Sequence, residues 1–158
     1  MRAPLLALSI ALLLTGCATG PQDRATPLAT SRSYAAPFDK VWGALVAEVS
    51  ADCPVQNVDK ASGLITSQQM SFGGSYGGWR TLEIYAYQPK AFLATWTGGT
   101  RGSLTFYVSS ADPTNTTIRV TARFEAFEDN VSKSWHTWES NGVLENKYLG
   151  KVSRAIGL

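Results

Sequence analysis

The chain has few of the residues that most often bind metals or carry out catalysis. It contains one histidine, His136, and two cysteines, Cys17 and Cys53. A structural zinc ion needs four ligands, so Cys53 and His136 alone cannot hold one. We therefore predict no metal and no cofactor. Charged residues are only 16% of the chain, and the cations are dispersed without a run. Nothing in this distribution supports nucleic-acid binding, which depends on basic patches.

The sequence also lacks an apolar run long enough to cross a membrane. Its N-terminal apolar stretch covers about ten residues, from Leu5 to Leu14, which is about half the length of a transmembrane helix. This length, after the positive Arg2, is typical of a signal peptide. The stretch ends in Leu-Thr-Gly-Cys, with Gly16 before Cys17, and resembles the bacterial lipobox. That resemblance implies cleavage between Gly16 and Cys17 and lipidation of the cysteine thiol. The alternatives are an uncleaved anchor and a chance cysteine in a core helix.

Lipidation of Cys17 makes the membrane a predicted partner, because two or more acyl chains provide stable anchoring. Ala18 and Thr19 follow the cysteine, without the aspartate that favours inner-membrane retention in enterobacterial-type lipoproteins. We therefore predict the periplasmic side of the outer membrane rather than the inner membrane. Three regions result: a signal peptide over 1–16, a lipidated cysteine with a flexible tether over 17–31, and a single domain over 32–158.

Periodicity predicts the first half of the domain. Apolar residues at steps of three and one from Phe38 to Val49 indicate an amphipathic helix, which Pro37 begins and Pro54 ends. Residues 31–35 fit a short strand before it. Residues 55–69 fit a strand or hairpin that turns between Asp59 and Gly63.

The second half alternates apolar and polar residues over 82–87, 104–108 and 118–124. This pattern predicts antiparallel strands with one face buried and one exposed to water. Residues 111–115 form a predicted turn, and residues 89–100 fit a short strand or an irregular connection. Residues 132–158 are predicted to be helical, with Gly142 either breaking that helix after Trp138 or allowing close contact with the sheet. The predicted fold is α+β, in the order β-α-β-β-β-β-α, with two helices on one face of an antiparallel sheet.

Together, the lipobox, "PFDKVWGALV", "ASGLITSQ", the alternating strands and "SNGVLENKYL" resemble small bacterial lipoproteins of unassigned role. Their domain is similar to the helix-grip modules of the lipoprotein subunit of the outer-membrane β-barrel assembly machinery. The resemblance implies a helix-grip domain. That subunit normally has two such domains, whereas this chain has room for one.

One motif suggests a hydrolase. Residues 73–77 match G-x-S-x-G around Ser75, and Asp112 or Asp129 precedes His136 in the order found in α/β-hydrolases. That nucleophile requires a strand before the serine and a helix after it. Here strand-like alternation follows the serine, so we predict no enzyme.

Aromatic residues give two candidate interaction surfaces, because tryptophan contributes much of the energy at interfaces. The alternative is that these residues belong to the core. Glu145 is either a contact residue or a carboxylate at a helix N-terminus, and Cys53 is either buried or paired between molecules. The two candidate surfaces are Trp135 with Trp138, and Phe72 with Tyr76, Trp79 and Trp96.

The sequence thus predicts a non-catalytic, lipid-anchored envelope protein that acts as an adaptor for an envelope protein partner. The alternative is a helix-grip module that binds a small apolar molecule or lipid between the sheet and its helix. The size of Trp42, Phe106, Phe124 and Tyr148 favours a filled interior over a cavity.

Overall fold

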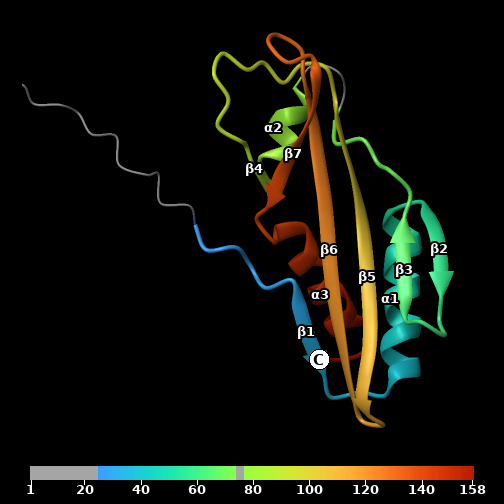
Figure 1. The fold of residues 1–158 in the computed structure, drawn as a ribbon. Helices are drawn as coiled ribbons and strands as arrows, with labels where there is room; N and C mark the ends of the chain where they lie inside the picture. The colour runs from blue at the N-terminus through green and yellow to red at the C-terminus, as the bar shows by residue number, and fades with distance from the viewer. Residues whose placement is uncertain (1–24, 74–76) are drawn as a thin grey trace, which may run out of the picture.

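A computed structural model describes residues 25–73 and 77–158 (Figure 1). The predicted signal peptide, the cleavage site at Gly16 and Cys17, and the candidate residues Ser75 and Tyr76 lie outside the described residues. The elements, in chain order, are β1 Ser31–Tyr34, α1 Phe38–Asp52, β2 Val55–Asp59, β3 Leu64–Ser67, α2 Gly78–Leu82, β4 Ala86–Tyr87, β5 Thr100–Asp112, β6 Asn115–Glu128, β7 Ser134–Ser140 and α3 Val143–Ala155.

An antiparallel sheet organises the molecule, in the order β2-β3-β5-β6-β7-β4. β5 and β6 form a long hairpin that runs from one end of the molecule to the other (Figure 1). β1 and β7 share the second edge of β6 end to end, because β1 pairs with residues 116–119 and β7 with residues 124–128. The predicted α+β class with an antiparallel sheet is confirmed.

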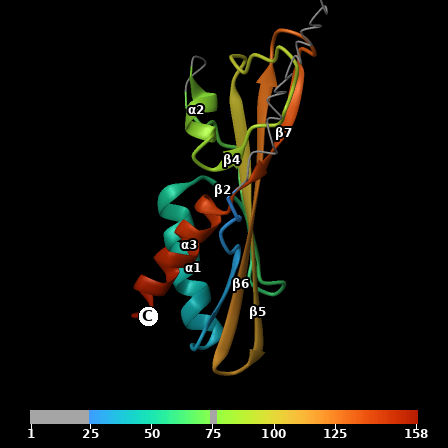
Figure 2. The ribbon, with the colours of Figure 1, turned by 90° about the vertical axis from the view of Figure 1, so that its left-hand side faces the viewer.

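The core lies between this sheet and the helices, which all lie on one side of it (Figure 2). The predicted stripe of α1 is confirmed, since Val41, Trp42, Leu45 and Val49 are buried. Alternation in β5 and β6 is also confirmed. Their inward side chains include Leu104, Phe106, Val108, Ile118, Val120 and Phe124, all of which are buried.

The strand predicted over 82–87 is wrong for most of its length. Residues 78–82 form α2, and only Ala86 and Tyr87 pair with β7. Leu82 and Ala86 are buried as expected, but Ile84 is 56% exposed. Leu82 and Ala86 are four residues apart, a spacing that places side chains on one face of a helical turn as well as of a strand.

The helix predicted from residue 132 is also wrong in its first part. Residues 134–140 form β7, and α3 begins only after Gly142, which has φ +82°. β7 occupies the part of the β6 edge that β1 leaves open, where its backbone groups find partners. Gly142 therefore separates a strand from a helix, and a Cβ atom there would lie 2.3 Å from the carbonyl oxygen of Leu28. Residues 88–99 form an irregular connection, which is one of the two predicted alternatives.

Residues 25–30, which the sequence analysis assigns to the tether, lie along the domain. The backbone N–H of Leu28 donates to the carbonyl of Asn141 at 2.9 Å, and the carbonyl of Thr30 accepts from Val120 at 2.8 Å. The Tyr87 hydroxyl donates to the carbonyl of Ala25. None of the helices within residues 25–73 and 77–158 has the length and hydropathy needed to span a membrane.

Candidate functional site

No helix of the described residues covers the face of the sheet that points away from α1, α2 and α3, and we call this face the open face (Figure 2). Along each strand, every second side chain points to the open face, and the side chains between them point into the core. Tyr107 is 50% exposed there and lies opposite Arg119 in the β5–β6 register. Arg123 and Trp135 are also exposed. The open face therefore combines arginine and aromatic side chains.

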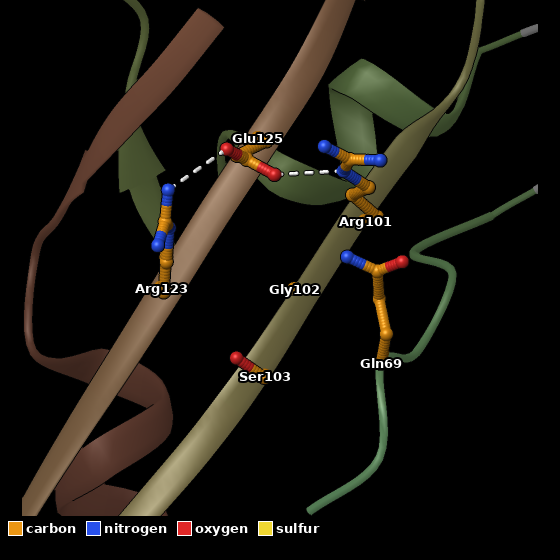
Figure 3. Close-up of a pocket in the computed structure, with 6 residues that line it drawn as sticks. All are labelled: Gln69, Arg101, Gly102, Ser103, Arg123 and Glu125. Carbon is orange, nitrogen blue, oxygen red and sulfur yellow. Dashed lines mark hydrogen bonds and ion pairs between the residues drawn. The ribbon is translucent and has the colours of Figure 1, made fainter. Parts of the chain in front are cut away.

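A pocket of about 270 Å³ lies on the open face, and we call it the arginine pocket (Figure 3). At one end of it, the carboxylate of Glu125 accepts hydrogen bonds from Arg101 Nε at 2.7 Å and from an Arg123 terminal nitrogen at 3.2 Å. One carboxylate thus faces two guanidinium groups, which leaves a local excess of positive charge. The pocket is lined by Gln69, Arg101, Gly102, Ser103, Arg123 and Glu125.

Trp135 borders the arginine pocket and connects it to β7. The guanidinium carbon of Arg101 lies 3.9 Å from the Trp135 ring centroid, which is a cation–π contact. The ring of Phe127 packs edge-on against the same tryptophan at 5.5 Å. Trp135 is still 38% exposed, so it is held in place while presenting part of its surface to solvent.

Two of the predicted interaction residues are core residues instead. Trp96 is 4% exposed and Trp138 is 1% exposed, so neither offers a surface to a partner. Their rings pack against each other edge-on at 5.4 Å, because β7 directs Trp138 toward the helix side of the sheet and the 88–99 connection folds over it. This corrects the prediction for both residues.

The other predicted residues are only partly available. Trp79 is half-buried, and the guanidinium carbon of Arg80 lies 5.2 Å from the centroid of its ring. Phe72 is half-buried and packs edge-on against Phe124 at 5.4 Å. Of the described candidates, Trp135 is the one with a clearly exposed ring.

The residues proposed for hydrolysis do not assemble into a catalytic group in the described part of the chain. Asp112 binds Thr114 and Asn115 in the β5–β6 turn, at the opposite end of the hairpin from His136. Asp129 accepts hydrogen bonds from the hydroxyls of Thr95 and Thr97, which lower the pKa of its carboxyl group.

His136 does contact a serine, Ser132, that belongs to none of the sequence motifs. Its Nε2 lies 2.7 Å from Ser132 Oγ. The Ser132 hydroxyl donates to Glu128 Oε2 at 2.8 Å, so its proton is directed away from the imidazole. A serine nucleophile requires the opposite arrangement, with its proton on the base.

Glu128 organises the loop between β6 and β7. Its carboxylate accepts backbone hydrogen bonds from Asn130, Val131 and Ser132. Burial would raise the pKa of Glu128, but the hydrogen bonds from Ser132, Val131 and Asn130 outweigh that effect and hold the pKa far below its usual range.

A pocket of about 400 Å³ lies between the sheet and the helices. Phe106 and Phe124 are fully buried, as the prediction of a filled interior requires, but Tyr148 lines this pocket. Burial is the largest of the effects that raise the pKa of the Tyr148 hydroxyl, and the neighbouring Cys53 and Asp52 add to it. The lining consists of Asp52, Met70, Ser71, Phe72, Gly73, Thr81, Tyr85, Leu104, Leu144, Lys147 and Tyr148.

Cys53 itself is a free cysteine and is buried, with its thiol donating to the carbonyl of Val49 at 3.3 Å. Of the two readings that the sequence left open, this geometry supports the buried one. Burial also raises the pKa of the thiol, which lowers its reactivity.

Glu145 is a carboxylate at the N-terminus of a helix, as one of the two predicted alternatives has it, but it is not at the surface. It lies in the first turn of α3 but is 1% exposed. Its Oε1 accepts from Ser140 Oγ at 2.7 Å and from the backbone N–H of Ala122 at 3.3 Å. Its Oε2 and the Nε1 of Trp138 have no hydrogen-bond partner among the described residues. The signal for burial is in the sequence, because Glu145 falls on the apolar stripe with Tyr148, next to Leu144.

No protein-family model matches the chain, and no curated protein matches it closely enough to count as a relative. Residues 25–73 and 77–158 contain no group of three or more His, Cys, Asp or Glu side chains placed to hold a metal ion.

Proposed function

We propose that the protein is a non-catalytic, lipid-anchored binding module on the periplasmic side of the bacterial outer membrane. The observation that carries this proposal is the open face, where the arginine pocket and the exposed ring of Trp135 lie side by side. The lipobox-like sequence ending at Cys17 supports the anchor and the compartment.

The chemistry of the open face favours a protein partner with an acidic side chain. Arg101 and Arg123 share the single carboxylate of Glu125, and neither forms another ion pair with a described residue. Each guanidinium has five N–H donors in a planar arrangement that suits carboxylates. A carboxylate from the partner therefore has donors available in the pocket, while Trp135 supplies the apolar contact that anchors many interfaces.

A second candidate function is supported by the pocket of about 400 Å³ between the sheet and the helices, which is open to solvent on one side and which we call the interior pocket. Met70, Phe72 and Leu104 give it an apolar wall. The Nζ atom of Lys147 lies at its rim, 3.7 Å from Asp52. These features fit a small apolar molecule with one polar end, which keeps the ligand-binding alternative open.

Crosslinking in cells tests the adaptor function. A photo-crosslinking amino acid at position 107, on the open face, should trap an envelope protein, and Arg123→Glu should abolish that product. Arg123→Lys keeps the charge and should retain part of it. The matched control is a crosslinker at Lys60, in the β2–β3 turn. Products at position 107 that do not change with Arg123→Glu would exclude the arginine pocket as the site.

Two further measurements separate the parts of the proposal. Cys17→Ser should leave an unprocessed precursor without lipid, and a cleaved, membrane-bound variant would refute the anchor. Native mass spectrometry of the purified protein should show no bound small molecule if the protein is an adaptor. A retained apolar molecule, lost in Leu104→Trp, would favour the interior pocket.

A further inference from the structure

Two loops lie together at the end of the molecule opposite the β5–β6 turn (Figures 1 and 2). One is the connection over 88–99, and the other is the loop between β6 and β7. They expose three large apolar side chains: Phe92 is 86% exposed, Leu93 is 66% exposed and Val131 is 63% exposed. We call these three residues the apolar tip. A contiguous exposed apolar group of this kind marks a contact site.

We propose that the apolar tip inserts into the interfacial layer of a phospholipid bilayer. Side chains of this type enter the boundary between headgroups and acyl chains to a depth of about 5–10 Å. Phe92 and Val131 also border a pocket of about 230 Å³, with Ala91 and Ala94 in its wall. This gives the tip an apolar recess next to its protruding side chains, which suits the methylene groups of a lipid.

The loops hold the apolar tip in position before any contact is made. The Glu128 carboxylate accepts the backbone N–H of Val131 and also that of Thr95, so it joins the two loops. Asn130 Nδ2 donates to the carbonyl of Leu93 at 2.8 Å. Leu93 has φ +52°, a conformation that non-glycine residues rarely adopt, and this hydrogen bond helps to hold it there. Exposing the tip therefore requires no rearrangement.

The charges around the apolar tip complement an anionic lipid surface. Lys90 and Lys133 are exposed beside it, and neither forms an ion pair within residues 25–73 and 77–158. The nearby carboxylates of Glu128 and Asp129 are directed into their own loops, toward backbone N–H groups and threonine hydroxyls. A lysine near an anionic surface adds electrostatic attraction to the apolar contact. The cationic rim thus favours anionic phospholipid headgroups over a basic or purely apolar protein groove.

The start of the described chain limits how far the domain can lie from its anchor. The carbonyl of Ala25 accepts a hydrogen bond from Tyr87 of β4, and β4 lies in the same half of the molecule as the 88–99 connection and the β6–β7 loop (Figure 1). Eight residue steps separate Cys17 from Ala25, so an extended chain spans at most about 28 Å. This step rests on the proposed lipid at Cys17, whereas the chemistry of the tip does not. A short connection keeps the tip within reach of the same membrane.

The test uses the full protein with an environment-sensitive fluorescent amino acid at position 131, mixed with excess phosphatidylethanolamine–phosphatidylglycerol vesicles that carry nitroxide-labelled acyl chains. The matched control carries the fluorophore at Thr114, in the β5–β6 turn. We expect a blue shift and quenching at position 131 and no change at position 114. Flotation of the same samples, compared with Cys17→Ser, reports the anchor separately.

Two variants identify the cause of the signal at position 131. Phe92→Ser combined with Leu93→Ser should remove the quenching, and Lys90→Glu combined with Lys133→Glu should weaken it on vesicles that contain phosphatidylglycerol. If position 131 shows no quenching in excess lipid, or if positions 131 and 114 are quenched equally, the proposal is wrong. Vesicle flotation without quenching at position 131 would support the anchor and overturn the tip.

Discussion

Two tryptophans three residues apart in β7 should respond very differently to replacement by alanine. Trp138 is 1% exposed and packs against Trp96, whereas Trp135 is 38% exposed and packs against Arg101 and Phe127. In the sequence, both belong to one candidate surface. The structure separates them into a core residue and a surface residue.

The expected magnitudes follow from what each ring contacts. Trp138→Ala removes about 200 Å² of buried apolar surface. At 25 cal/mol per Å², this loss corresponds to about 5 kcal/mol of the free energy of unfolding. The same change removes the unpartnered Nε1–H, which recovers about 1 kcal/mol, so the expected loss of stability is about 4 kcal/mol. Trp135→Ala removes one ring pair and one cation–π contact, together about 1.5 kcal/mol.

Urea unfolding of both variants, followed by circular dichroism, measures this difference. In a thermal scan the two losses correspond to decreases in Tm of about 12 °C and about 4 °C. Trp138→Phe is the matched control, since it keeps most of the ring and has no Nε1–H. Equal destabilisation by the two alanine variants would refute the assignment of Trp135 to the surface, and a stable Trp138→Ala would refute the core assignment.

Three further predictions concern the scaffold. Gly63→Ala should lower the free energy of unfolding by about 2 kcal/mol or more, because the new Cβ lies 2.1 Å from a main-chain oxygen of β5 at φ +70°; an unchanged urea midpoint would contradict this. Glu145→Ala should cost about 1–3 kcal/mol in a thermal melt because it leaves Ser140 without its acceptor, while Glu145→Gln, which keeps an acceptor, should cost less. The pKa of Glu128 is lowered in the folded protein, so its ionised carboxylate stabilises the 129–133 loop. This stabilisation is complete above about pH 4.3, the pKa of glutamate in the unfolded chain, and decreases as the pH falls below that value. The protection factors of the backbone N–H groups of residues 130–132, which correct for the slower intrinsic exchange in acid, should therefore decrease on acidification, and Glu128→Gln should remove most of that pH dependence.

The sequence predicts well those elements in which the buried side chains recur at one regular spacing. α1 and the β5–β6 hairpin each bury one face, so the steps in α1 and the alternation from Leu104 to Phe124 are visible without a structure. β7 was missed because Trp135 and Trp138 have helical spacing, and because its pairing depends on which part of the β6 edge β1 leaves open. Local periodicity carries no information about such an edge.

The arginine pocket was missed for a related reason. Arg101 and Glu125 are distant in the sequence and become neighbours only through the register of β5 against β6. The sequence does identify Trp135 as a candidate, because exposed tryptophan is a general sign of contact. It cannot say which tryptophan is exposed, since that depends on which side of the sheet each one faces.

The β5–β6 hairpin also determines how the molecule unfolds. The same two strands support α1 and α3 at one end and carry the two loops of the apolar tip at the other. Neither end of the molecule can unfold alone, because its unfolding would break the β5–β6 hydrogen bonds on which the other end also depends. The domain should therefore behave as one cooperative unit, with a single unfolding transition and no stable proteolytic half. A ligand bound at either end would then protect the amides of the whole hairpin against global exchange.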